Sequence, residues 1–370
     1  MFLRTLIASL IVSSVSYANV APPQKAMRLI ETGQGIQTWM TEVEVDAMAA
    51  KIHEAGRCGG YMDVTDYPAQ PRAYLAPFDF RIFQIRHEAV VRAALPYLSE
   101  PKLKSWIEQL SAFPSRYYNI EGGKKAAEWL ESQFSELGKS RSDVSVQFFR
   151  HEKWKQPSVI ARIQGKGPHA NETVILGAHL DSIQWGFAWP VPQGKAPGAD
   201  DDASGIATLL ETFRVLMETD FSPDRSIEFI AYAGEEKGLL GSQEIARQYR
   251  SNNREIVAIT QFDMTMFPGA NTGINFIMDN THPELTEFGK KLTETYVGVP
   301  WFETQCGYGC SDHASWNKEG YATVFPFEST FDSMNKKIHT ENDLIQYLDI
   351  AHGLQFAKFA VAFAIEMSGN

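Results

Sequence analysis

The chain has 370 residues, of which 44% are hydrophobic and 21% are charged. This length and composition are ordinary for a soluble globular enzyme or receptor with a large core. The formal net charge of −11 argues against nucleic acid as the main partner, because phosphate binding needs clustered Lys and Arg.

The first residues are typical of a secretory signal peptide. Arg4 precedes an apolar run that ends at Val15, and small residues follow up to Ala18. We expect residues 1–18 to be a signal peptide that is cut after Ala18. The alternative is a membrane anchor, but the run is short for a bilayer and no later segment has about 20 consecutive apolar residues. The sequence thus predicts a soluble exported protein, extracellular or periplasmic, with no membrane partner.

Residues 19–85 differ from the rest of the chain. They are polar and mixed, and "DYPAQPRAYLAPFDF" carries three prolines. This composition is linker-like and marks a boundary. In an exported enzyme we interpret residues 19–85 as a removable pro-segment and residues 86–370 as the catalytic domain. A permanent accessory domain is the alternative.

From residue 86 onward, helix and strand patterns alternate. Helical spacing covers 101–112, 122–138, 204–220, 239–252, 283–297 and 345–367. Apolar strand patterns cover 158–163, 172–181, 225–236, 255–265 and 274–279. Such alternation predicts an α/β fold, a mostly parallel mixed sheet flanked by helices on both faces.

Polar side chains follow three of these strands. His179 and Asp181 end the first, Glu235 and Glu236 end the second, and Asp263 ends the third. In open α/β sheets, ligands bind beyond the carboxyl ends of the strands. The sequence therefore brings one histidine and four carboxylates to one edge of the sheet.

Three consecutive aspartates, in "PGADDDASG" (197–205), fall at the same edge. So many carboxylates are unfavourable together unless cations neutralise them. Histidine with carboxylates suits zinc, manganese or cobalt better than calcium, and the EF-hand spacing is absent. A second histidine is required, and His339 in "KIHTEND" is the best candidate.

These motifs resemble those of the secreted bacterial zinc aminopeptidases of the leucyl aminopeptidase type. "GAHLDS", "PGADDDASG", "AYAGEEKGLLGSQ", "QFDMT", "CGYGCSDHASW" and "IHTENDL" occur in the order and at separations similar to those of that family. The resemblance runs from about residue 100 to the end and implies a zinc-exopeptidase-like fold with two Zn²⁺ per chain. It assigns His179 and Asp263 to one zinc, Glu236 and His339 to the other, Asp201 as the bridge, Glu235 as general base and Asp181 as support for His179.

Each implied role has a physical reason. A bridging carboxylate can hold two metals roughly 3.5–4 Å apart. A metal-bound histidine usually donates its other N–H to a carboxylate. Glu235 and Glu236, if they lie on a strand end, point in different directions, so one can bind metal while the other faces substrate. Asp200 and Asp202 are expected to fix the turn or to cap the following helix.

The expected activity is removal of the N-terminal residue from peptides by a water that two metals activate. A free substrate α-amine would bind near the acidic groups. Seven residues match the apolar specificity pocket of the family and predict a bulky first residue such as Leu or Phe: Met264, Ile277, Tyr308, Phe325, Phe327, Phe331 and Ile338. Ile338 stands where some members have a tyrosine that stabilises the oxyanion, so that device is absent.

Several alternatives stay open. His313 competes with His339 as a ligand, although we interpret His313 as structural or supporting. Cys306 and Cys310 are expected to form a disulfide rather than a zinc site, because no second pair lies at suitable spacing, and Cys58 is left over. The fold could instead serve a deacylase, a carboxypeptidase, a glutaminyl cyclase or a non-catalytic receptor. Nothing suggests a large assembly, so we expect a monomer.

Overall fold

The computed structural model describes residues 26–33, 35–54, 60–68, 84–186 and 190–369. The predicted signal peptide, Cys58 and parts of the predicted pro-segment lie outside these residues and stay predictions.

The centre of the fold is a six-stranded mixed sheet in the order β11-β8-β6-β7-β5-β4. The parallel part consists of β11 (Thr323–Val324), β8 (Ile256–Gln261), β6 (Thr173–His179) and β7 (Ser226–Tyr232). β5 (Ser158–Ile163) runs antiparallel to both its neighbours, β7 and β4 (Val144–Phe149). The prediction of a mostly parallel mixed sheet is confirmed.

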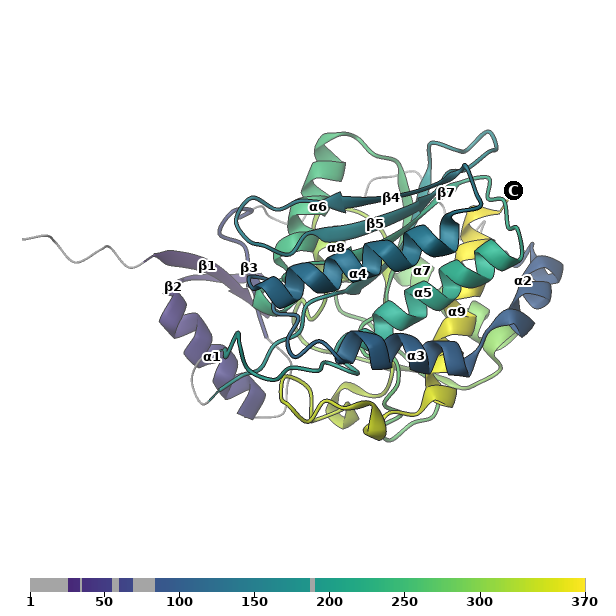
Figure 1. Cartoon of the computed structure of the whole chain (residues 1–370). Helices are drawn as coiled ribbons and strands as arrows, with labels where there is room; N and C mark the ends of the chain where they lie inside the picture. Colours follow the sequence, from purple (N-terminus) through teal and green to yellow (C-terminus); the bar gives the residue numbers. More distant parts are fainter. Residues whose placement is uncertain (1–25, 34, 55–59, 69–83, 187–189, 370) are drawn as a thin grey trace, which may run out of the picture.

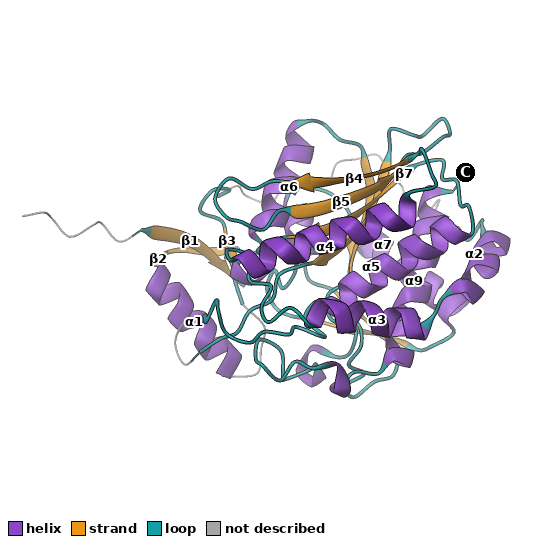
Figure 2. Ribbon diagram, in the orientation of Figure 1, coloured by secondary structure: helices purple, strands orange, loops and turns teal. Residues whose placement is uncertain are grey.

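Helices cover both faces of this sheet (Figures 1 and 2). On β6, Leu176 packs into the larger apolar cluster and Ile175 into a second cluster. The larger cluster receives α2 (Glu88–Ala94), α3 (Glu100–Ser111), α4 (Glu121–Gly138), α5 (Ala203–Glu218), α7 (Pro283–Leu292) and α9 (Ile350–Ser368). The second receives α6 (Leu240–Ser251) and α8 (His313–Lys318). Strands buried on both faces explain the continuous apolar runs in the sequence.

α9 is the one described helix that is long and apolar enough to cross a membrane. However, 72% of its most apolar window is buried inside the protein, where Phe359 and Phe363 pack in the core. The Asp349 side chain caps it by accepting the N–H groups of Ala351 and His352. The helix starts later than the 345–367 pattern predicts, because residues 345–347 form a separate 3-10 turn.

The strand predicted at 274–279 lies outside the main sheet. β9 (Ile274–Ile277) forms a small sheet with β10 (Trp301–Thr304) and β12 (Pro326–Phe327), in the order β10-β9-β12. Its apolar pattern predicts a buried strand correctly, but strand pairing depends on contacts distant in sequence. The predicted helix 283–297 is α7 followed by a π-helical turn, Thr293–Val297.

The described part of residues 26–68 is folded, contrary to its linker-like composition. It contains β1 (Met27–Thr32), β2 (Ile36–Thr41), α1 (Glu42–Glu54) and β3 (Met62–Asp63), with sheet order β2-β1-β3. We call it the N-terminal unit. It projects at one end of the molecule (Figure 1), and its Met62 packs with Leu239 and Ala314 of the main body. The Asp63 N–H donates to the Gly238 carbonyl at 3.0 Å.

Candidate metal centre

The predicted ligands meet at the carboxyl edge of the sheet. His179 is the last residue of β6, and Asp263 follows β8 by two residues. Asp201 lies in the loop before α5, Glu236 in a 3-10 turn after β7, and His339 in the segment before α9. The parallel pairing of β6 with β7 and β8 helps to bring together groups that lie up to 160 residues apart in the chain.

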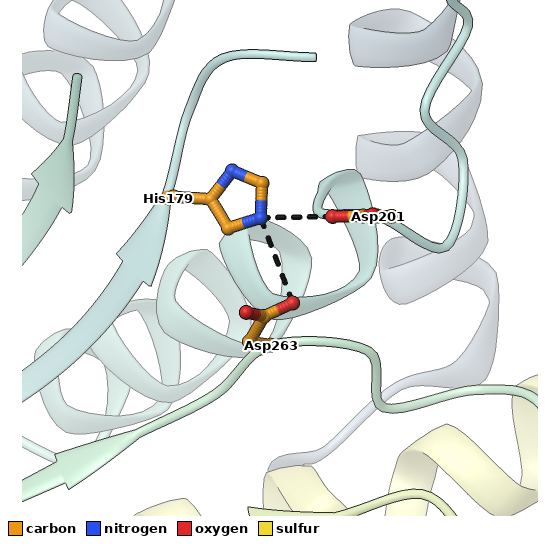
Figure 3. Close-up of side chains that lie close together, drawn as sticks. All are labelled: His179, Asp201 and Asp263. Carbon is orange, nitrogen blue, oxygen red and sulfur yellow. Dashed lines mark hydrogen bonds and ion pairs between the residues drawn. The ribbon is translucent and has the colours of Figure 1, made fainter. Parts of the chain in front are cut away.

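These five residues form two clusters that share Asp201. In the first, the His179 Nε2 lies 2.8 Å from Asp201 Oδ1 and 3.5 Å from Asp263 Oδ1 (Figure 3). In the second, the His339 Nε2 lies 2.7 Å from Asp201 Oδ2 and 2.9 Å from Glu236 Oε2. One carboxylate oxygen of Asp201 thus faces each cluster, and the arrangement is that of a buried dimetal centre.

The donor set fits divalent ions. All five side chains are buried, and the Glu236 Oε1 has no hydrogen-bond partner among the described residues. A buried carboxylate oxygen without a partner is costly unless a cation binds it. Imidazole nitrogen combined with carboxylate oxygen suits zinc and related transition metals. The residues therefore fit the pair of ions that the motifs predict.

The clusters shift the pKa values of their own members. Burial raises the pKa of Glu236 to about 7, against the opposing effect of His339. Burial alone would lower the pKa of His339, but Glu236 and Asp201 override it and raise that pKa to about 10. Burial would raise the pKa of Asp201, yet the two histidines hold it below its usual value. Without metal, the histidines thus act as the cations of the site.

Asp181 supports this centre from the side of β6. Its backbone carbonyl lies 3.2 Å from the His179 Nδ1, and its carboxylate lies 3.6 Å from that nitrogen. The same carboxylate accepts the N–H groups of Glu235 and Glu236 at 3.0 and 3.3 Å. Asp181 therefore holds the ring of His179 and the turn that carries both glutamates.

Glu235 and Glu236 do not lie on a strand end as expected. β7 ends at Tyr232, and the two glutamates begin a 3-10 turn, Glu235–Lys237. The αL conformation of Gly234, with φ 69°, ends the strand direction before them. Even so, only Glu236 joins a cluster, while the half-buried Glu235 lines the adjoining cavity.

The neighbours of Asp201 have other partners. Asp202 is the N-cap of α5 through the Gly205 N–H at 2.8 Å, and it also accepts the N–H of His179 at 3.0 Å. Asp200 accepts a hydrogen bond from the Asn335 amide at 2.9 Å. The fully buried His313 is in neither cluster. Its Nε2 lies 3.0 Å from a backbone carbonyl, and burial lowers its pKa to about 4.

The seven residues predicted for the apolar pocket lie in one buried cluster beside the centre. Met334 and Cys306 complete this cluster, and Met334 is the one of its buried members for which the sequence predicts no role. Cys306 and Cys310 are joined in a disulfide. That bridge fixes the segment of Tyr308, which also lines the cavity at the metal centre.

The N-terminal unit covers this cavity. Gly60 and Tyr61 line it together with Glu235, and the space left for water-sized molecules is about 30 Å³. A single water needs roughly 10–15 Å³ by the same measure, so the remaining space is that of a few waters and is small for a bulky side chain such as Leu or Phe. The His53 ring of the same unit packs edge-on against the His339 ring, with centroids 4.3 Å apart.

Other buried groups near the centre escaped the sequence patterns. Asp312 is fully buried, and its burial raises its pKa to about 7. Arg116 and Asp343 are fully buried on opposite sides of the Asp201 loop. Asp343 lies in the segment "IHTENDL", but the sequence predicts no role for it. Arg116 lies in none of the six motifs that resemble the family.

Comparison with known proteins agrees with the site. The profile of peptidase family M28 matches residues 158–364. The chain is 38% identical to leucine aminopeptidase 1 of Metarhizium robertsii over 94% of its own length and 89% of the relative. The structure of the LapA aminopeptidase of Legionella pneumophila superposes with a TM-score of 0.81 and 29% identity, over 94% of this chain and all of that one.

The chain therefore belongs to peptidase family M28. Within the family it belongs with the leucine aminopeptidases, and it is a metallohydrolase that acts on peptides. The fold is also found in the glutaminyl cyclase of Porphyromonas gingivalis, with a TM-score of 0.59, 18% identity and 73% of this chain covered. That likeness concerns the fold alone, so activity is argued from the residues of the site.

Proposed function

We propose that the chain holds two zinc ions and uses them to remove the N-terminal residue of peptides. The main support for this proposal is the position of Asp201. Its two carboxylate oxygens face two separate histidine–carboxylate clusters. His179 and Asp263 would bind one ion, and Glu236 and His339 the other. Zinc bound there would polarise the scissile carbonyl and lower the pKa of a bound water.

Glu235 is the proposed general base. Its carboxyl lines the cavity beside both clusters and belongs to neither. Burial raises its pKa well above the usual value, against the opposing effect of His179. A carboxylate in this position takes a proton from the attacking water and later donates it to the leaving amine.

The proposed substrate is a peptide with a free N-terminus and a bulky apolar first residue. The carboxylates around the cavity favour a cationic α-amine, and the buried apolar cluster lies next to Tyr308 at the cavity wall. The test combines elemental analysis of the purified enzyme with a panel of aminoacyl and N-blocked substrates. We expect two zinc ions per chain and turnover of leucyl and phenylalanyl substrates only when the amine is free; efficient turnover of N-acetylated substrates would contradict this.

Other chemistries on the same fold make different demands. A carboxypeptidase needs a cation for the terminal carboxylate of its substrate, yet no Arg or Lys lines the cavity at the centre among the described residues. A single-metal cyclase does not need the second cluster around His339. A pure binding protein has no use for the spare carboxylate of Glu235. The same substrate panel separates these cases, since deacylation requires the blocked amine that an aminopeptidase rejects.

We also propose that residues 19–85 are a pro-segment and that the enzyme is secreted as a monomer, extracellular or periplasmic. The first proposal is supported by Gly60 and Tyr61, which leave only about 30 Å³ at the centre. Mass spectrometry of the exported protein would identify the mature N-terminus, and sedimentation would give its oligomeric state. Full activity of a purified chain that keeps residues 19–85 would refute the pro-segment.

A further inference from the structure

Arg116 is a buried cation with no carboxylate in direct contact among the described residues, although the nearby carboxylates of Asp343, Asp202, Asp181 and Asp201 favour its charge. Its side chain is fully buried, and among the described residues no carboxylate lies within ion-pair distance of it. Its guanidinium instead donates to backbone carbonyls: Leu180 at 2.9 Å, Gly198 at 3.0 Å, and Pro197. A buried charge is costly to keep in this way, so its position calls for a reason beyond packing.

Besides a longer contact of 3.5 Å to the Leu110 carbonyl of α3, the carbonyls that Arg116 holds belong to two segments of the metal centre. Leu180 follows His179 at the end of β6, while Pro197 and Gly198 open the loop that carries Asp201. The backbone of Gly198 is in the left-handed region, with φ 53°, and a Cβ there would lie 2.7 Å from the Arg116 Nη2. The glycine thus permits the close approach of guanidinium and loop.

Asp343 holds the same loop from its other side. Its carboxylate accepts the Asp201 N–H at 3.0 Å and the Asp200 N–H at 3.1 Å, and its backbone carbonyl accepts the Ala199 N–H at 3.3 Å. Asp343 is fully buried and lies four residues after His339. The loop is therefore tied to β6 through Arg116 and to the His339 segment through Asp343.

The charges of Arg116 and Asp343 are each complementary to the backbone groups that they contact. The cation faces carbonyl oxygens and the anion faces amide hydrogens, on either side of Asp201. Hydrogen bonds to charged groups are shorter and stronger than neutral ones, and a low-dielectric interior strengthens them further. We propose that Arg116 and Asp343 act as a clamp that positions the Asp201 carboxylate between the two clusters, and that zinc affinity depends on this clamp.

This inference rests on the proposed two-zinc centre and adds two positioning residues to it. Among the described residues, neither charged group contacts the side-chain ligand atoms of a cluster. Both act through the backbone of the Asp201 loop. Residues that orient metal ligands in this way typically change metal affinity or activity by about 10- to 100-fold when they are altered.

The test uses the full chain with Arg116→Lys, which keeps the charge but loses the planar fork, and with Asp343→Asn, which turns an amide NH₂ toward backbone N–H donors. The matched control is Arg214→Lys, because Arg214 is also buried but pairs with Glu211 at 2.6 Å on α5. Each metal-free variant is titrated with zinc against a chelator. The visible spectrum of the cobalt form reports coordination geometry, and kcat and KM are measured for a leucyl substrate.

We expect zinc to bind about 10- to 100-fold more weakly to both clamp variants than to Arg214→Lys, with an altered cobalt spectrum and a fall in kcat larger than the change in KM. Folded clamp variants with the zinc affinity and cobalt spectrum of the control would overturn the clamp. If neither folds, Ser182→Ala replaces them, since the Ser182 hydroxyl accepts the backbone N–H of Arg116 at 3.1 Å and so helps to place the residue that carries the guanidinium. A smaller loss of zinc affinity then supports the clamp, and unchanged affinity overturns it.

Asp201→Asn separates this inference from the proposed function. If Asp201→Asn binds zinc like the wild type, the two-zinc centre itself is wrong. If Asp201→Asn weakens zinc binding while the clamp variants match the control, the centre stands and only the clamp is wrong.

Discussion

The carboxylate of Asp181 accepts the backbone N–H of Glu235 at 3.0 Å. The backbone carbonyl of Asp181 also lies 3.2 Å from the ring of His179. One residue thus fixes the distance between a predicted zinc ligand and the predicted base. A general base must lie within hydrogen-bond reach of the water that it deprotonates. The separate roles of Glu235 as base and Glu236 as metal ligand can therefore be tested by substitution.

Replacing Glu235 with Gln should remove the base and leave the metal centre intact. We expect kcat to fall by about 10²- to 10⁴-fold with zinc content near two per chain. Glu236→Gln is the matched variant, since the same change one residue later alters a predicted ligand and should lower zinc content. Steady-state kinetics and elemental analysis measure both effects. Equal zinc loss in the two variants would contradict the separate roles.

His339→Ala and His313→Ala should differ in metal content. The His339 Nε2 faces Glu236 and Asp201, whereas His313 packs on Phe325 with a ring-centroid distance of 4.8 Å. We therefore expect the first variant to lose bound zinc and the second to keep it while losing some stability. Elemental analysis after dialysis and thermal unfolding check this. Zinc loss in His313→Ala alone would exchange the two assignments.

Zinc binding should release protons and weaken as the pH falls. In the metal-free protein, the carboxylates around His339 raise its pKa to about 10, although burial opposes them, and burial raises the pKa of Glu236 to about 7. Zinc binds only the deprotonated forms, so protons compete with it. Isothermal titration calorimetry in two buffers of different ionisation enthalpy measures the release. An apparent affinity that is the same at about pH 6 and pH 8 would refute the competition.

Loosening the N-terminal unit should raise the activity of the unprocessed chain. Lys237 of the main body pairs with Asp46 of α1 at 2.6 Å, and both side chains are largely buried. Asp46→Lys places two cations together, so we expect activity to increase several-fold. Asp66→Lys carries the same charge change at the exposed pair with Lys153 and should have little effect, because exposed pairs contribute about 0–1 kcal/mol. A loss of activity in Asp46→Lys would instead favour a permanent accessory domain.

The apolar cluster should control the preference for the first residue of the substrate. Phe327 and Phe356 are both buried, the first in the predicted pocket and the second on α9 in the main core. Phe→Leu at either position should destabilise the protein, because each leaves unfilled space. Only Phe327→Leu should change the ratio of kcat/KM between phenylalanyl and leucyl substrates. An equal ratio in the two variants would remove Phe327 from the pocket.

The sequence by itself predicts most of the sheet and the five residues of the two clusters. Continuous apolar runs predict strands buried on both faces, and the ends of parallel strands meet at one edge, so His179, Asp263 and Glu236 follow from local pattern. The need for a second histidine points to His339, whereas the motifs of the family assign the bridge to Asp201 and separate the ligand Glu236 from the base Glu235. The sequence pattern predicts a strand end at Glu235, where the structure has a 3-10 turn, because apolar periodicity does not show where a left-handed glycine ends a strand.

Only the tertiary structure decided the contacts between distant segments. The linker-like composition of residues 19–85 gives no sign that their described part, within residues 26–68, is folded. Tyr61 of this part lines the cavity at a centre whose residues lie more than 100 positions later. Arg116 meets Leu180 and Gly198 across 64 and 82 residues, and no periodicity in the sequence encodes such a pairing. The sequence specifies which groups stand at the ends of elements, whereas packing of the whole chain determines which backbone atoms a buried charge can reach.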